Sequence, residues 1–532
     1  MTPYYVTTPI YYVNDRPHIG HCYTTCLADV AARFARLMGR DVYFLTGTDE
    51  HADKVIEAAR KHGMSEQAWT DQCSGEFVKQ FAAMNFSNDV FYRTSSQQHK
   101  TLAAKYIQNL VDQGDIYLGD YVGWYDASQD EYLTETTAKE HEYKSPVTKL
   151  PLEKRTEKNY FFRLSKYEDV LRKHIESHSA FVLPVSRKNE IIGRFKEGLQ
   201  DVPVSRALKP GESLWGVLMP NDPGHRVYIW IEALCNYLTA IDTPEKRKYW
   251  PASVHLMAKD IVWFHAVIWP AMLMALGEPL PRTIYAHAYW VSEGRKMSKS
   301  LGNFIDLEKL NAYAKTFGVD ALRYFLVTQG PQDATDADFA HARFIETYNA
   351  ELANGIGNAT SRVGNMIDKY FGGVVPDPKG VHALPDLQAQ FDWPSITATA
   401  VRSAIAKSET LDLAGATFEG ITLVRKVDAY INVTEPFKLA KKIEAEPALR
   451  ERLAAVLYHC AEALRVASIL LSPAMPAKMA QLHGIWNCTP PRGVSLSALC
   501  DWHGAHALKP GQGVTKGEVL FMRADPAAAL VV

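Results

Sequence analysis

The chain has 532 residues, enough for about three domains of ordinary size. Its 58 basic and 60 acidic residues leave a net charge of −2, which excludes a scaffold that binds nucleic acid through bulk positive charge. There is no uncharged apolar run of about 18 residues and no basic segment typical of a secretory signal, so we expect no membrane span. The seven cysteines form no Cys-x-x-Cys pair, which indicates a reduced, cytoplasmic protein.

Strands and helices are predicted to alternate in the first part of the chain. Residues 4–8 and 41–46 are aromatic and β-branched runs typical of buried strands. Apolar residues recur at helical spacing between them, from Gly20 to Leu37, and a second helix is expected to end near Gly63. This order predicts βαβ units and therefore a parallel sheet.

The pattern changes further along the chain. The polar segment from Gly119 to about Pro184 is typical of an inserted hairpin or small subdomain, after which the α/β pattern resumes. Helical periodicity dominates from Asp338 to about Leu482. The last residues are rich in proline and glycine and contain an apolar run, 519–522, that we predict to be a strand.

Two short motifs carry candidate chemistry. His18-Ile19-Gly20-His21 stands between a strand and the start of a helix, where free N–H groups and imidazoles favour a phosphate and Gly20 permits close approach. Lys296-Met297-Ser298-Lys299-Ser300 is a basic loop bounded by glycines, which could close over a pyrophosphate. Alone, a histidine pair is usually a packing feature and a basic loop is usually solvated. Their occurrence together, in this order at the edges of α/β segments, favours nucleotide chemistry.

This pair of motifs resembles the class I aminoacyl-tRNA synthetases, and other segments most resemble the methionyl-tRNA synthetases within that class. The supporting segments are 7–12, 47–51, 228–233, 264–265, 269–270 and 432–437. The resemblance runs from residue 1 to about 525. It implies an α/β Rossmann-type catalytic domain with a connective insertion, followed by an α-helical bundle that binds the anticodon. The expected boundaries are 1–118 and 185–337 for the two catalytic halves, 119–184 for the insertion, 338–485 for the bundle, and 486–532 for a tail that packs back on the enzyme.

The length of the insertion narrows the choice of amino acid. A hydrophobic pocket separates substrates that differ by one methylene only about 10–200-fold, so the resembling enzymes for Ile, Val and Leu carry a large editing domain. Such a domain does not fit here, and the cysteinyl enzymes need thiolate zinc ligands that this chain lacks. The implied reaction is the ATP-dependent ligation of L-methionine to tRNA(Met) through methionyl-adenylate, releasing AMP and pyrophosphate.

Two other classes compete with this reading. One is a non-catalytic tRNA-binding paralogue, against which the intact motifs argue. The other is a synthetase-like nucleotidyltransferase, against which the complete helical domain argues. Because no appended tRNA-binding domain follows the bundle, we expect a monomer.

The resemblance also assigns roles to individual residues. The implied catalytic residues are His18, His21, Lys296 and Lys299. The implied ATP-binding residues are Gly20, Asp260, Lys296, Met297, Ser298, Lys299 and Ser300. Methionine is expected to contact Ile10, Tyr12, Asp49, Trp230, Ala233, Tyr237, Ile261 and His265, with Asp49 on its ammonium. The anticodon is expected to contact Asn358, Arg362 and Phe437.

Helical spacing agrees with these roles but also allows plainer ones. Residues 261, 264, 265, 268 and 269 fall on one face of a single helix, a pattern that is more often simple core. Asn354, Asn358 and Arg362 form one stripe of another helix, which could equally be a solvated polar face. Phe437 stands where relatives carry tryptophan and can still stack on an unpaired base.

The chain departs from the family pattern at several positions. It has Ala258 and Ala52 where resembling enzymes have glycine, and Glu232 where they have aspartate. Many relatives hold zinc in the insertion with four cysteines, whereas residues 126–149 contain no cysteine and one histidine. We therefore expect no structural zinc, and Mg²⁺ only as it arrives with ATP.

Overall fold

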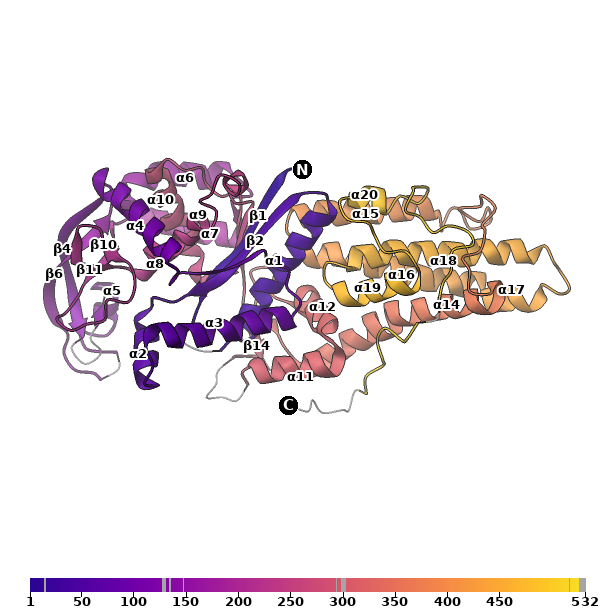
Figure 1. The fold of residues 1–532 in the computed structure, drawn as a ribbon, viewed down its shortest axis with the longest axis horizontal. Helices are drawn as coiled ribbons and strands as arrows, with labels where there is room; N and C mark the ends of the chain where they lie inside the picture. Colours follow the sequence, from indigo (N-terminus) through magenta and orange to yellow (C-terminus); the bar gives the residue numbers. More distant parts are fainter. Residues whose placement is uncertain are drawn as a thin grey trace.

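The computed structural model describes residues 1–13, 16–126, 131–133, 135–146, 148–292, 294–297, 303–515 and 517–525. The molecule is elongated, with the α/β part at one end and a helical bundle at the other (Figure 1). Helices α1 and α12 lie where the two parts meet (Figure 1).

The α/β part is built on a six-stranded sheet with the order β3-β2-β1-β12-β13-β7. Its strands are β1 (Pro3–Tyr12), β2 (Asp41–Asp49), β3 (Val90–Arg93), β7 (Val182–Leu183), β12 (Val254–Ala258) and β13 (Ile284–His287). All five pairings are parallel, which confirms the predicted Rossmann-type sheet. Between β1 and β12 the order of strands reverses, and ligands of such sheets bind at the carboxyl ends beside that switch point.

Helices pack around this sheet and lead into the bundle. They are α1 (Ile19–Leu37), α2 (Asp53–Lys61), α3 (Glu66–Ala83), α4 (Gln97–Asp112), α8 (Ile229–Leu234), α9 (Asn236–Thr239), α10 (Trp269–Leu276), α11 (Leu307–Phe317) and α12 (Val319–Gln329). The predicted end of the first helix is confirmed, since α1 stops at Leu37 and Gly39 follows with a φ of 77°.

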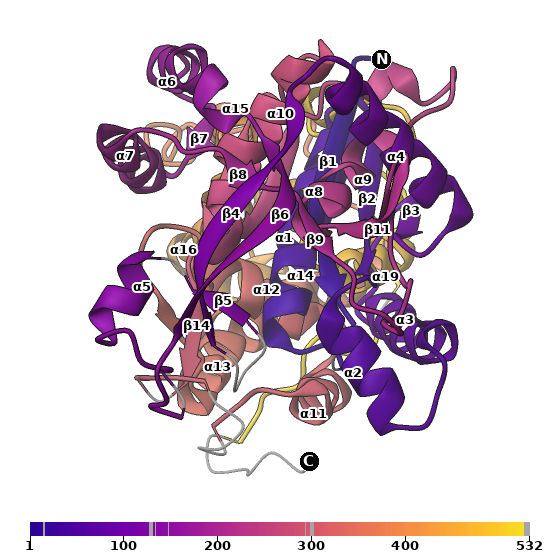
Figure 2. The same cartoon turned by 90° about the vertical axis from the view of Figure 1, so that its left-hand side faces the viewer.

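The insertion is an antiparallel sheet with the order β5-β4-β6-β8, at the end of the molecule away from the bundle (Figure 2). Its strands are β4 (Ile116–Asp126), β5 (Glu131–Leu133), β6 (Glu153–Phe162) and β8 (Val202–Pro203), with helices α5 (Glu135–Glu140), α6 (Glu168–Ser177) and α7 (Val185–Arg194). The chain leaves the insertion to form β7, which pairs in the central sheet, and then returns to form β8, which pairs with β6 of the insertion.

Two small sheets complete the α/β part. One has the order β10-β11-β9, from β9 (Ser205–Ala207), β10 (Leu218–Met219) and β11 (Asp222–Val227). The other has the order β15-β14-β16, from β14 (Trp290–Ser292), β15 (Arg295–Lys296) and β16 (Ala337–Asp338). This second sheet joins the root of the basic loop to the strand that leads into the bundle.

The bundle consists of long helices around a dense apolar core. Its helices are α13 (His341–Thr347), α14 (Asn358–Phe371), α15 (Trp393–Glu409), α16 (Leu413–Thr434), α17 (Pro436–Lys442), α18 (Leu449–Leu471), α19 (Pro476–Ile485) and α20 (Leu496–Leu499). Among the described residues, α18 alone is long and apolar enough to cross a membrane, and its apolar stretch is wholly buried in the bundle. Its composition is therefore explained by its place as the central helix of the core.

Two predicted elements differ from the structure. The helix predicted to carry Asn354, Asn358 and Arg362 is interrupted: a π-helical segment spans Tyr348–Gly357, and Gly355 has non-helical φ/ψ of −84° and −112°. The predicted strand at 519–522 does not form. Leu520 and Phe521 are buried instead, and the Tyr348 hydroxyl donates to the Met522 carbonyl at 2.7 Å. Burial of this run against the bundle, rather than pairing in a sheet, explains its apolar composition.

Candidate active site

The first motif forms the N terminus of α1. The Gly20 N–H donates to His18 Nδ1 at 3.1 Å, and the His18 N–H donates to His21 Nδ1 at 3.2 Å. Because both Nδ1 atoms accept, the proton of each neutral ring sits on Nε2. Burial and the neighbouring His18 lower the pKa of His21 well below its usual value. His21 is thus a neutral N–H donor at a helix N terminus, a place that favours phosphate.

Gly20 suits this geometry, because a larger residue would press on the His18 ring. A Cβ at position 20 would lie 3.0 Å from His18 Cε1, closer than side chains normally approach. Asp260, the other predicted ATP-binding residue outside the basic loop, is exposed just after β12. Gly20 and Asp260 therefore follow the two strands that flank the switch point, as a nucleotide site requires.

The second motif is described only in part. Strand β15 ends at Lys296, whose main chain pairs with Val291, and Met297 packs partly buried against the main core. Ser298, Lys299 and Ser300 lie outside the described residues. The far side of the loop rests on the first motif: Phe304 lies edge-on to His18 at 5.2 Å, and the Ile19 N–H donates to the Ile305 carbonyl at 3.3 Å. The fold thus brings the flank of the second motif against the first.

A small hollow opens beside β1, and we call it the Asp49 pocket. Its lining residues are Pro9, Ile10, Asp49, Trp230, Ala233, Leu234, Asn236, Tyr237 and His265. Most residues that the sequence assigned to methionine therefore line one cavity. Tyr12 and Ile261 do not line it: Tyr12 packs edge-on to Trp230 at 6.0 Å, and the Ile261 carbonyl faces His265.

Sequence reasoning missed three lining residues, Pro9, Leu234 and Asn236. Pro9 and Leu234 directly adjoin predicted lining residues, so their position along the chain was the available signal. Asn236 likewise adjoins the predicted lining residue Tyr237, just after the short helices α8 and α9 meet at Cys235.

The predicted single helical face at 261–269 is also modified. Residues 264–268 form a π-helical turn before α10, which changes the register of the residues that follow. His265 reaches the pocket, whereas Trp269 is fully buried in the core.

The floor of the Asp49 pocket is polar but neutral. His265 Nδ1 lies 3.0 Å from the Ile261 carbonyl and must carry the ring proton, so His265 Nε2 accepts from the Tyr237 hydroxyl at 2.8 Å. Burial lowers the pKa of His265 to about 4, which keeps the ring uncharged near neutral pH. Aromatic rings around a neutral hydrogen-bonded pair suit a polarisable thioether.

Asp49 is the charged group of the pocket. It is 3% exposed, and its Oδ1 has no hydrogen-bond partner among the described residues. Burial and the charge of Glu232 raise the pKa of this carboxyl well above its usual range. A bound ammonium would supply the missing partner and favour the ionised carboxylate, because an unpaired buried polar group is costly.

The substituted Ala258 lies at the end of β12, next to Lys259. Lys259 Nζ contacts Asp336 Oδ1 at 2.7 Å, and its ammonium lies over the Tyr289 ring. Asp336 precedes β16, so this ion pair joins the strand end beside the switch point to the segment that enters the bundle.

The candidate anticodon residues lie on the bundle. Phe437 is 41% exposed on α17, and Asn358 is exposed at the start of α14. Arg362 Nη1 lies 3.4 Å from Asp428 of α16. The predicted continuous stripe with Asn354 is wrong, because Gly355 interrupts the helix between Asn354 and Asn358.

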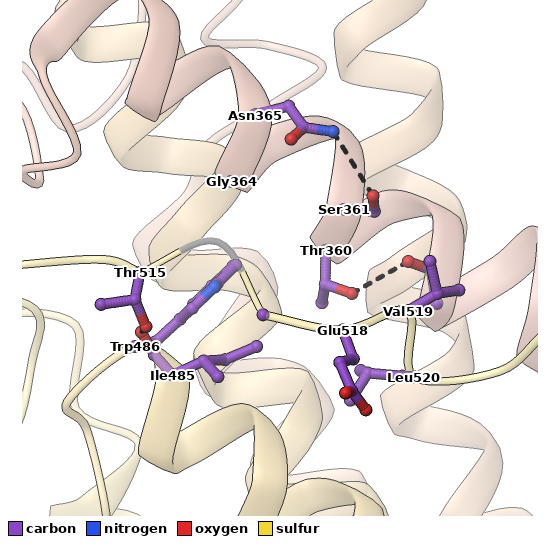
Figure 3. A pocket seen from close by; sticks show the side chains of 12 residues that line it. Thr360, Ser361, Gly364, Asn365, Ile485, Trp486, Thr515, Glu518, Val519 and Leu520 are labelled. Atoms are coloured by element: carbon purple, nitrogen blue, oxygen red, sulfur yellow. Dashed lines mark hydrogen bonds between the residues drawn. The ribbon is translucent and has the colours of Figure 1, made fainter.

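A second hollow lies in the bundle, away from these motifs (Figure 3). It forms where the tail, through Thr515 and Glu518, runs between α14 and the end of α19 near Trp486. The Thr360 hydroxyl donates to the main-chain carbonyls of Ile356 and Gly357 at the start of its helix. We interpret this hollow as a packing gap beside the tail.

Metal ligands do not gather in the described part of the chain. No group of three or more His, Cys, Asp or Glu side chains there could hold an ion. All seven cysteines are free thiols, and only Cys488 is more than marginally exposed.

A Rossmann-type sheet with the first motif at its switch point and the flank of the second motif against it, joined to a helical bundle, is the arrangement of a class I aminoacyl-tRNA synthetase. Residues 4–364 match the family model described as tRNA synthetases class I (M). A methionine–tRNA ligase of Caldanaerobacter subterraneus subsp. tengcongensis is 42% identical over 98% of this chain and 79% of its own length. That of Streptomyces coelicolor is 41% identical over 99% of this chain and 98% of its own.

Comparison of the fold with solved structures points to the same family. The structure of Mycobacterium tuberculosis methionyl-tRNA synthetase in complex with methionyl-adenylate aligns with a TM-score of 0.86 at 33% identity, covering 98% of this chain and all of that one. The chain therefore belongs to the methionyl-tRNA synthetase family, as the sequence motifs predicted.

Proposed function

We infer that the protein is a methionine–tRNA ligase. It activates L-methionine with ATP to methionyl-adenylate and pyrophosphate, then transfers the methionyl group to the terminal adenosine of tRNA(Met), releasing AMP. The observation that carries this proposal is the Asp49 pocket, beside the N terminus of α1. It combines a buried carboxyl, whose Oδ1 has no partner among the described residues, with a neutral aromatic floor.

In this proposal the substrate ammonium binds the Asp49 carboxylate, and the thioether packs on the aromatic floor around Tyr237 and His265. Trp230 stacks on Phe264 with ring centroids 4.1 Å apart, which gives the wall a broad apolar face. The methionine carboxylate is then left to point toward the N terminus of α1, where the α-phosphate of ATP is held.

No residue acts as a nucleophile in this mechanism. The methionine carboxylate attacks the α-phosphate in line, and catalysis comes from positioning and stabilisation of charge. His18 and His21 donate from Nε2 to phosphate oxygens, while Lys296 and Lys299 neutralise the departing pyrophosphate. Mg²⁺ arrives with ATP and screens its phosphates.

The second substrate is tRNA(Met), which we assign to the bundle. Phe437 offers an exposed ring for an unpaired base, and Arg362 and Asn358 offer donors and acceptors to base edges. We further propose that the enzyme acts as a cytoplasmic monomer, which light scattering of the purified protein would test.

Methionine-dependent exchange of pyrophosphate into ATP, followed by charging of bulk tRNA, tests the proposal. Exchange and charging with methionine alone among the standard amino acids are expected. Exchange without charging would indicate a nucleotidyltransferase, and tRNA binding without either reaction would indicate a non-catalytic paralogue.

A further inference from the structure

A buried carboxylate behind the Asp49 pocket ties three elements together. Glu232 Oε1 accepts from His51 Nδ1, and Glu232 Oε2 accepts from His99 Nε2, each at 2.8 Å. These residues lie on α8, on the loop after β2, and on α4. Their exposed fractions are 1%, 4% and 0%, and His99 Nδ1 is satisfied by the Thr239 hydroxyl at 2.9 Å.

The cluster adjoins the pocket without lining it. Asp49, Ala233 and Trp230 line the pocket, whereas Glu232, His51 and His99 are not among its lining residues. His51 follows Asp49 by two residues, and its main-chain N–H interacts with the Asp49 carboxylate and favours the ionised form. A path of contacts thus runs from Glu232 through His51 to Asp49, and it acts against the direct charge of Glu232, which disfavours ionisation of the Asp49 carboxyl.

The residue between Asp49 and His51 is anchored from the other side. The Glu50 carboxylate receives Arg93 Nε at 2.7 Å and Nη2 at 3.0 Å, and the Glu50 carbonyl accepts from the Trp215 indole at 2.6 Å. The Glu50 carbonyl and the His51 N–H belong to one peptide group, so that group is held by Trp215 on one side and by the Glu232-bound His51 side chain on the other.

A buried carboxylate is expensive, and replacing such a group with apolar residues is often neutral or stabilising. Burial alone would raise the pKa of Glu232, but the His51 and His99 interactions outweigh it and lower the pKa to about 2. The chain therefore keeps a full negative charge at a costly place, directly behind the pocket.

We propose that Glu232 is a positioning residue for methionine binding, which holds His51 and through it the Asp49 carboxylate in the orientation that receives the substrate ammonium. The inference rests on the proposed function, in which Asp49 binds that ammonium. Glu232 does not touch the substrate, and its effect is confined to the charged end of the amino acid.

A matched pair of inhibitors isolates that effect. L-Methioninol and 4-(methylsulfanyl)butan-1-ol differ only by the amino group, so the ratio of their inhibition constants against methionine measures the ammonium contact. Glu232→Gln and His51→Phe are each expected to reduce the ratio about tenfold or more, the loss of one charge-assisted contact. Glu232→Asp, which keeps the charge, should retain most of it.

His459 supplies the control for a merely structural role. It is a buried histidine of the bundle, bonded to the Tyr430 hydroxyl at 2.9 Å and the Val381 carbonyl at 2.8 Å. His459→Asn should lower the melting temperature and leave the inhibitor ratio unchanged.

Asp49→Asn distinguishes a failure of the ammonium assignment from a failure of the positioning role of Glu232. An unchanged ratio in this variant would remove the ammonium from Asp49 and overturn the pocket assignment itself. The positioning role alone would be overturned if the ratio collapsed in Asp49→Asn but stayed at the wild-type value in Glu232→Gln and His51→Phe. Equal loss of affinity for both inhibitors in these two variants would overturn it as well. Should Glu232→Gln fail to fold, His51→Phe decides by the same ratio.

Discussion

The imidazole rings of His18 and His21 lie against each other at the start of α1, with centroids 3.8 Å apart, and each Nδ1 accepts a main-chain N–H. The two residues cap their own helix while fixing their own tautomers, since each Nδ1 is used and the ring proton must sit on Nε2. Capping and phosphate binding therefore use different atoms of the same side chains, and substitution can separate them.

Changing His18 to asparagine or to glutamine makes that separation. Asparagine is among the best N-cap residues, so His18→Asn should leave the melting temperature close to wild type. It places no donor where Nε2 lies and should slow pyrophosphate exchange about 10²-fold or more, the scale of one lost preorganised contact. His18→Gln is one methylene longer and should retain more activity. A reversed order of the two variants in exchange assays would contradict the tautomer assignment.

The joint between the α/β part and the bundle depends on one buried ion pair. Arg323 Nη2 on α12 donates to Asp29 Oδ2 on α1 at 2.7 Å, and Arg323 also donates to the Met84, Pro473 and Ala474 carbonyls. Asp29 has a second cation, Arg33, at 2.8 Å, whereas Asp29 is the one carboxylate paired with Arg323 among the described residues.

Replacing Asp29 should therefore lower the free energy of unfolding more than replacing Arg323 does. Asp29→Asn leaves a buried guanidinium without a counterion, and we expect a loss of about 3–5 kcal/mol in the free energy of unfolding. Arg323→Met leaves Asp29 paired with Arg33 and should cost less, and the double variant should recover part of the loss. Urea unfolding of the three proteins checks this order, and strictly additive effects would argue against the pair.

Buried histidines should make the fold sensitive to mild acid. Burial lowers the pKa of His265, His287, His459 and His483 to about 4. Between that value and about 6.5 the unfolded chain binds more protons than the folded one, so stability is lost as pH falls through this window. Burial raises the pKa of Asp320 and Glu462, which acts in the opposite sense.

His459 offers a test of this dependence because it lies far from the active-site motifs. His459→Asn should lower the melting temperature at neutral pH, since two hydrogen bonds are lost, and should flatten its decline between about pH 6.5 and pH 4.5. Thermal melts of both proteins across that range measure the two slopes. Parallel slopes would mean that His459 does not titrate with unfolding.

The sequence predicted those parts of the fold and of the site that are encoded in short, continuous segments. The βαβ order and the two motifs predicted the sheet and its switch point, because alternation, turns and glycines are local signals. The Glu232–His51–His99 cluster joins residues far apart in the chain, and no local period reveals such a contact. The buried path of Phe521 depends on packing against the bundle, which overrides local propensity.

The expectation that the enzyme needs no structural zinc can be tested directly. With no cysteine in the predicted insertion, activity should survive prolonged dialysis against a zinc chelator once Mg²⁺ is restored. Elemental analysis of the purified protein should find far less than one zinc per chain. About one tightly held zinc, with activity lost on its removal, would contradict the expectation.

Phe437 should separate the two half-reactions. Its ring is 41% exposed on α17, which lies toward the end of the bundle away from the α/β part (Figure 1). Stacking of a base on an aromatic ring is worth about 1–3 kcal/mol, so Phe437→Ala should raise the KM for tRNA(Met) or lower charging by about tenfold or more. Pyrophosphate exchange needs no tRNA and should stay near wild type, and Phe437→Trp should be tolerated because the larger indole also stacks. Both reactions are measured on the same preparations, and equal losses in exchange and charging would make Phe437 a structural residue and remove the anticodon from its helix.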